Sequence, residues 1–148
     1  MDGTLLGAFR DGDFCVNDED DVDLGILGSD YDRVMELVPY MERLGFEFQD
    51  PLVHNDRLEG FALRRAWFHF DIFRINRHPD RRECYNLGRT RGKHFAFVYP
   101  SHHHEFFDAV EFYGAQFQIP CDTANLLAVR YGIDWNVPTP RPRPDYHW

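Results

Sequence analysis

The chain has 148 residues, of which 43% are hydrophobic and 16% aromatic, which is enough for the core of a single domain of ordinary size. No apolar run approaches the roughly 20 residues that a membrane span needs, and no signal-peptide layout opens the chain, so we expect a cytoplasmic protein without a membrane span. The net charge of −9 disfavours nucleic acid as a partner, because a negative surface repels a phosphate backbone. Seven of the 25 acidic residues fall between Asp11 and Asp23, and such a local concentration attracts divalent cations.

The first candidate functional segment is Gly3-Thr4, where we expect a turn and then a short helix with Thr4 as its N-cap. The exposed amides at such a helix start can hold a phosphate. After an acidic loop, apolar residues alternate with Asp21 and Asp23 over residues 21–26, which is the period-2 pattern of a strand. We therefore predict a strand with one buried face and one functional face.

An amphipathic helix is predicted next. Ser29 and Asp32 resemble a capping box, and apolar residues then recur at helical spacing as far as Gly45. Pro39 lies inside this segment and removes one backbone donor, so we expect a kink or a break there.

Strands dominate the expected structure of the remaining chain. Residues 58–76 are expected to form two antiparallel strands that break near Arg65-Ala66, with Asp71 in the second. Residues 77–93 show no periodicity beyond a loop with a short strand. The other expected elements are strands at residues 46–48 and 94–99, a hairpin over residues 110–119 that turns at Tyr113-Gly114, a helix from Asp122 to about Tyr131, and an extended proline-rich tail over residues 136–148.

Three aspartates form the candidate metal site. Asp21 and Asp23 share a strand face, with Cα atoms roughly 6.6 Å apart, so their carboxylates converge. Asp71 is flanked by large apolar residues, where an unpaired charge is costly, and Mg²⁺ or Mn²⁺ would remove that cost. An EF-hand loop does not fit, because apolar residues occupy its ligand positions. Each part of this site has a competing structural interpretation. The acidic run before Asp23 could be a solvated loop, and Asp71 could instead form a salt bridge with Arg64 or Arg74.

Two other groups receive structural interpretations. Residues 102–104 are three consecutive histidines, but consecutive side chains of an extended chain point to alternating sides, so we do not predict a zinc site there. If zinc did bind there, Cys84 or Cys121 would be the candidate further ligands. The three cysteines are odd in number and widely spaced, so we do not expect a disulfide framework. Tyr131 and Trp135 can stack on a base or a sugar, yet we predict that they pack in the core.

Several motifs follow one another in a specific order. They are Gly3-Thr4 with the helix after it, Asp20-Asp21-Val22-Asp23-Leu24-Gly25-Ile26, His69-Phe70-Asp71-Ile72-Phe73, Phe112-Tyr113-Gly114, Ile119-Pro120, Leu126-Leu127 and Tyr131-Gly132-Ile133-Asp134-Trp135. This ordered series, which spans most of the chain, resembles the LicD/fukutin-related family, a branch of the nucleotidyltransferase fold. The resemblance implies an α+β (α/β) fold over residues 1–135, with a nucleotidyltransferase-like mixed sheet flanked by helices.

The resemblance also implies an activity. It is the transfer of a phospho-alcohol, such as phosphocholine or ribitol phosphate, from a CDP-linked donor to a hydroxyl of a sugar or glycan. The residues to which the resemblance gives a role are Asp21, Asp23 and Asp71 on the metal, with Asp71 as ligand or as base, and Gly3, Thr4 and Arg10 on the donor phosphates. Two alternatives stay open, namely a nucleotidyltransferase that releases pyrophosphate from a nucleoside triphosphate and a non-catalytic module that binds nucleotide and metal.

One departure from the family concerns the start of the chain. The family usually has a helix and a strand before the Gly-Thr turn, whereas only Met1 and Asp2 precede it here. We therefore expect part of the core or of the acceptor site to be missing or to be supplied by another chain, as in an oligomer.

Overall fold

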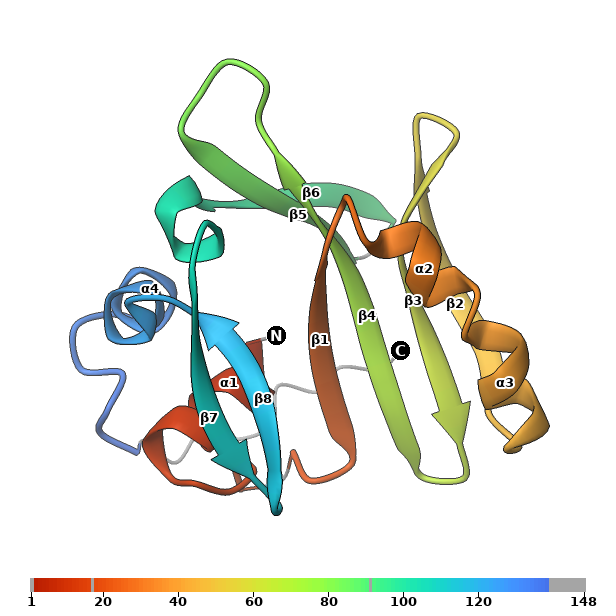
Figure 1. Ribbon diagram of the computed structural model, residues 1–148, viewed down its shortest axis with the longest axis horizontal. Helices are drawn as coiled ribbons and strands as arrows, with labels where there is room; N and C mark the ends of the chain where they lie inside the picture. Colours follow the sequence, from red (N-terminus) through yellow and green to blue (C-terminus); the bar gives the residue numbers. More distant parts are fainter. Residues whose placement is uncertain (1, 17, 91, 139–148) are drawn as a thin grey trace.

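The computed structural model describes residues 2–16, 18–90 and 92–138, which form an α+β protein in which strands predominate (Figure 1). The elements are α1 (Asp2–Arg10), β1 (Asp21–Leu27), α2 (Tyr31–Met35), α3 (Val38–Arg43), β2 (Glu47–His54), β3 (Arg57–Arg65), β4 (Phe68–Arg77), β5 (Glu83–Thr90), β6 (Lys93–Pro100), the 3₁₀ turn η1 (Ser101–His104), β7 (Phe107–Phe112), β8 (Ala115–Pro120) and α4 (Thr123–Tyr131). The predicted α+β class is confirmed, while the nucleotidyltransferase-like arrangement stays a prediction. Over these residues the structure contains no helix with the length and apolar character to cross a membrane.

Six of the strands form one sheet that is centred on β4. The strand order is β2-β3-β4-β5-β6, all antiparallel neighbours, and β1 joins the sheet by pairing in parallel with β4. β1 pairs with β4 along residues 69–75, whereas β5 pairs only with its last two residues, Asn76 and Arg77. β5 and β6 therefore continue the sheet from the end of β4, beyond the residues that pair with β1.

The alternation along β1 places its two faces against different cores. Leu24 and Ile26 pack with Tyr31, Phe61 and other apolar residues in the core under α2 and α3. Leu27 faces the opposite way and packs against a second core, to which α1, α4 and β8 contribute. Figure 1 shows the β7–β8 hairpin and α4 on the side of β1 away from β2 and β3. Asp21 and Asp23 share the face of Leu27, because side chains two apart in a strand point the same way.

The helical segment before β2 differs from the single helix expected. It is broken into α2 and α3, and Pro39 stands in the first turn of α3, where its missing N–H leaves no bond unmade. The predicted break is therefore confirmed, but it lies before the proline. The capping box is wrong, because Asp30 is the N-cap of α2 and the Ser29 hydroxyl donates to the Asp30 carboxylate instead.

The strand predictions are confirmed with one correction. β1, β3, β4 and β6 lie where they were expected, and Ala66 turns the β3–β4 hairpin with a φ of 55°. Tyr113 and Gly114 both have positive φ, as a two-residue hairpin turn requires. The correction concerns residues 77–93, predicted as a loop with a short strand, which contain the eight-residue β5. β5 pairs antiparallel with β6 along its whole length, a pairing that the sequence pattern of residues 77–93 does not indicate.

The C-terminal region agrees with the packing interpretation. α4 follows Asp122 and ends at Tyr131, although the Asp122 side chain accepts a hydrogen bond from Asn125 rather than from a helix amide. Tyr131 and Trp135 pack against the second core, as predicted. Most of the predicted proline-rich tail, residues 139–148, lies outside the described residues.

Candidate metal centre

The parallel pairing of β1 with β4 brings together the acidic residues of two distant sequence segments. Asp21 lies opposite His69, and Asp23 lies opposite Asp71. Neighbouring strands are separated by about 4.8 Å, so side chains on one face of this pair are within reach of a common ion. The register therefore assembles a polar patch from residues 48 positions apart.

Asp21, His69 and Asp71 form the tightest group in this patch. One ligand atom from each of the three lies within 4.8 Å of the other two. Nε2 of His69 lies 3.1 Å from Oδ1 of Asp21. That oxygen is buried and accepts no hydrogen bond, so its contact with His69 is an electrostatic one only. A buried carboxylate oxygen without a hydrogen bond is costly, and a cation would satisfy it.

Both carboxyl groups of this group titrate abnormally. Burial raises the pKa of Asp21 above its ordinary value, and the negative charge of Asp71 raises it further, although His69 opposes the shift. Burial also raises the pKa of Asp71, against the opposing effects of His69 and Arg64. The site thus resists carrying two negative charges unless a positive ion enters, which is the electrostatic signature expected of a divalent-cation site.

Asp23 lies at the edge of this group rather than in it. Its Oδ2 accepts a hydrogen bond of 3.3 Å from the backbone N–H of Gly3, in the first turn of α1. The predicted trio of Asp21, Asp23 and Asp71 is therefore only partly assembled, because α1 draws Asp23 toward itself. Asp23 stays adjacent, since it is the register partner of Asp71.

Thr4 does not cap α1, so that prediction is wrong. The helix begins at Asp2, and the Thr4 hydroxyl lies inside its first turn. It donates a hydrogen bond of 3.3 Å to the carbonyl oxygen of Asp21 and accepts one of 2.9 Å from the N–H of Asp23. Thr4 thereby clamps the start of α1 to the strand that carries the aspartates, and Gly3-Thr4 is the first turn of a helix rather than a turn before one.

Arg10 lies at the other end of α1, six residues beyond Thr4, or about 9 Å along the helix axis. Its guanidinium donates to the Asp11 carboxylate at 2.6 to 3.0 Å and to the carbonyl oxygen of Trp135 at 3.3 Å. The hydrogen bond to Asp11 raises the pKa of the Arg10 guanidinium. The structure therefore does not bring Arg10 to the carboxylates, and its predicted role at the donor phosphates stays a prediction.

His69 is the residue of this site to which the sequence analysis assigned no role. Its signal was present, because His69 precedes Asp71 by two positions and so shares its strand face, as Asp21 does with Asp23. The alternative of an Arg salt bridge for Asp71 is weakened, since Arg64 pairs with Asp50 at 3.0 Å and Arg74 with Asp32 at 3.5 Å.

The described residues fit a divalent cation. Carboxylate oxygens are the ligands that Mg²⁺ and Mn²⁺ prefer, and an imidazole nitrogen is better accepted by Mn²⁺ than by Mg²⁺. The orphaned Oδ1 of Asp21 and the raised carboxyl pKa values are the two observations of this structure on which that fit depends.

Comparison with known proteins agrees with the order of motifs. Residues 1–122, most of the chain, match the sequence model of the family described as LicD/FKTN/FKRP, nucleotidyltransferase domain. The matched region contains every residue of the candidate metal centre. No curated protein matches the chain closely enough to serve as a named relative.

Proposed function

The chain belongs to the LicD/FKTN/FKRP family, whose members are transferases, and we propose that it transfers a phospho-alcohol from a CDP-linked donor to a sugar or glycan hydroxyl. Phosphocholine and ribitol phosphate are the candidate groups, and CMP is the other product. The observation that carries the proposal is the meeting of Asp21, His69 and Asp71 on one face of the β1–β4 pair, with a buried carboxylate oxygen that accepts no hydrogen bond.

The charge of this site argues for phosphate chemistry assisted by a cation. A donor diphosphate is itself negative, and the buried carboxylates would repel it if they faced it alone. When bound, Mg²⁺ or Mn²⁺ would offset the negative charge that develops on the transferring phosphoryl group and on the leaving CMP. Asp21 and Asp71 would hold the ion. Asp23 would lie next to it, because the Gly3 amide binds its carboxylate and the Thr4 hydroxyl binds its backbone N–H.

The hydroxyl of the acceptor must lose a proton as it attacks the phosphorus. Asp71 can accept that proton only when it is ionised, and the same ionised form is needed for a metal ligand. His69 is a second candidate, because an imidazole can accept a proton and Nε2 of His69 lies 3.1 Å from Asp21 in the same group. We propose that Asp71 acts as ligand and that His69 accepts the proton, since this division leaves every ionised carboxylate on the metal.

The decisive experiment measures CMP release. The protein is incubated with Mn²⁺ or Mg²⁺, CDP-choline or CDP-ribitol, and a panel of glycans, and Asp21→Asn is compared with the unchanged chain. We expect release that depends on both metal and acceptor, and its loss in the variant. Asp56→Asn is a matched control, because Asp56 is an exposed turn residue with a φ of 58° that asparagine also adopts.

The other outcomes separate the alternatives. Pyrophosphate release from a nucleoside triphosphate, without CMP from the CDP-linked donors, would replace this proposal with a nucleotidyltransferase. Nucleotide and metal affinity in calorimetry, with no turnover across the acceptor panel, would indicate a non-catalytic module.

A further inference from the structure

A second group of metal-ligating side chains lies far along the chain from the acidic strand. We propose that His102, His103 and Asp122 form a site for a transition-metal ion of the Zn²⁺ type, at the junction between η1 and the start of α4. One ligand atom from each of the three lies within 4.8 Å of the other two. This site is independent of the proposed transferase chemistry, because it shares no residue with the Asp21, His69 and Asp71 group.

The 3₁₀ turn is what makes the site possible. In an extended chain two consecutive histidines would point to opposite sides, which is why the sequence alone argues against a site here. In η1 the rings of His102 and His103 instead lie beside each other, with centroids 4.0 Å apart and planes 38° apart. Two imidazoles on one side of a tight turn can contribute to a single ion.

His103 is arranged as a metal-ligating histidine usually is. Its side chain is fully buried, and Nδ1 lies 2.9 Å from the carbonyl oxygen of Cys121. A carbonyl can only accept, so Nδ1 must carry the proton of this hydrogen bond, and Nε2 is the ring nitrogen that can ligate an ion. That Nε2 is buried and has no hydrogen-bond partner. A backbone carbonyl that fixes the tautomer and leaves the other nitrogen for the ion is the common outer-shell arrangement of metal-bound histidine.

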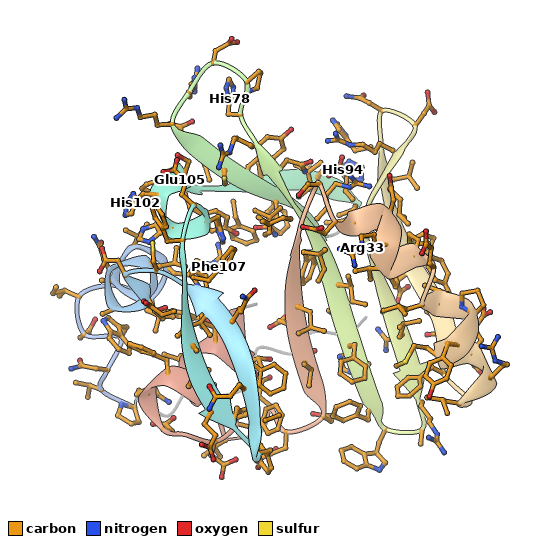
Figure 2. All side chains as sticks on the ribbon, in the orientation of Figure 1. Arg33, His78, His94, His102, Glu105 and Phe107 are labelled. Carbon is orange, nitrogen blue, oxygen red and sulfur yellow. The ribbon has the colours of Figure 1, made fainter. Side chains whose placement is uncertain are left out.

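The other two ligands leave room for the ion to reach the site. His102 and Asp122 have half-exposed side chains, and His102 Nε2 lies 3.9 Å from Asp122 Oδ2. Asn125 donates a hydrogen bond of 3.1 Å to that same Oδ2, which orients the carboxylate. Figure 2 shows His102 and Glu105 together at the η1 turn, next to α4. Solvent water can therefore complete a four-coordinate ion with three protein ligands.

The ligand set favours Zn²⁺ over Mg²⁺. Two imidazole nitrogens and one carboxylate suit zinc and its neighbours in the transition series, whereas Mg²⁺ prefers oxygen ligands. The two segments that carry the ligands already contact each other, because the N–H of Cys121 donates to the carbonyl oxygen of His103 at 3.1 Å. Zinc would then tie η1 to the β8–α4 junction and stabilise the folded chain by binding to it.

The test measures Zn²⁺ binding by calorimetry in the full chain, with Mg²⁺ in excess and with Asp71→Asn as the background that weakens the acidic site. We expect one zinc to bind in that background, and the dissociation constant to rise at least about tenfold in His102→Gln and in Asp122→Asn. Both positions are half exposed, so neither variant should unfold the chain. Co²⁺ in place of zinc should give the visible absorption of a four-coordinate site.

A second histidine pair supplies the matched control. Nδ1 of His54 lies 3.4 Å from Nδ1 of His94, at the opposite end of β6 from η1 (Figure 2). His94→Gln should leave zinc affinity unchanged. The proposal is overturned if no zinc binds, if His102→Gln and Asp122→Asn bind as before, or if His94→Gln abolishes binding. CMP release plays no part in these readouts, so a failure here is distinct from a failure of the proposed transferase.

Discussion

The acidic group on β1 and β4 and the histidine group at η1 are built in opposite ways. The first joins two carboxylates on a rigid strand pair, where burial raises the pKa of each and the charge of Asp71 raises that of Asp21 further. The second joins two imidazoles on a tight turn, one of them fully buried, with the half-exposed carboxylate of Asp122 beside them. Each holds one buried ligand atom without a hydrogen bond, Oδ1 of Asp21 in the first and Nε2 of His103 in the second.

The two groups differ in how strongly each depends on a bound cation. The acidic group is unstable without a cation, so a bound ion should stabilise it and activity should depend on that ion. The histidine group holds only one carboxylate, that of Asp122, which is half exposed and lies 3.9 Å from His102, so a metal there should add stability without being required for folding.

Removing one charge from the acidic group should separate function from stability. Asp71→Asn should lower CMP release by about 10²- to 10³-fold, because a ligand of the cation is lost. Without metal the same variant should be unchanged or more stable, since it removes the charge of Asp71 that contributes to the raised pKa of Asp21. Urea unfolding with and without Mn²⁺ measures both, and a marked loss of stability in the metal-free variant would contradict the contrast.

Lowering the pH should destabilise the region around η1. Burial, with a smaller contribution from His103, lowers the pKa of His104 from 6.5 to about 4. Between these pH values the unfolded chain binds a proton that the folded chain refuses, so stability falls as the pH falls, by about 3 kcal/mol over the whole window. Above pH 6.5 the residue has no such effect.

Comparison with His104→Phe isolates this contribution. The phenylalanine ring can keep the edge contact that His104 makes with Tyr99, at a centroid distance of 5.8 Å. Asp21 and Asp71 have raised folded pKa values and therefore act in the opposite direction, but they do so equally in both proteins. As the pH falls from 6.5 to 4, the unfolding free energy of the unchanged chain should fall relative to that of His104→Phe, and parallel curves would refute the assignment.

The close approach of α1 to the acidic loop predicts a loss of stability in Gly7→Ala. An alanine Cβ at this position would lie 2.4 Å from the carbonyl oxygen of Asp13 and 2.8 Å from the N of Cys15. Backbone must therefore move, at a cost of about 1–3 kcal/mol, although alanine would normally favour a helix by about 1 kcal/mol. Thermal unfolding measures the change, and an increase in stability would show that the loop does not pack against α1 as described.

Gly3→Ala is the matched comparison in the same helix. There the nearest atom is the carboxylate tip of Asp18 at 2.2 Å, which a side-chain rotation can remove. Its effect on stability should be clearly smaller than that of Gly7→Ala.

The clamp between α1 and β1 should give the smallest effect. Thr4→Val keeps the shape of the side chain but leaves the N–H of Asp23 without its 2.9 Å acceptor, at a cost of about 1 kcal/mol. Thr4→Ser retains the hydroxyl and should retain the stability. If both variants unfold at the same urea concentration as the unchanged chain, the hydroxyl does not hold the helix to the strand.

Local pattern determined much of the fold. The alternation around Asp21 and Asp23 defined β1 and its functional face, and the Tyr113-Gly114 pair defined a hairpin, because both depend on neighbours within a few residues. β5 was predicted only as a short strand within a loop, since its regular pairing comes from β6 and its own segment carries glycine and basic residues. The two short helices likewise depend on how α2 and α3 pack on the sheet.

Residue spacing alone places the carboxylates of β1 on one strand face, because side chains two apart in a strand point the same way. Which groups meet depends on the three-dimensional fold, since the parallel register of β1 with β4 sets His69 beside Asp21, while the Gly3 amide of α1 donates to Asp23. The same holds for the histidines, whose 3₁₀ turn reverses the geometry of an extended chain. Long-range pairing and local backbone conformation both select side-chain directions, and neither is encoded in residue spacing alone.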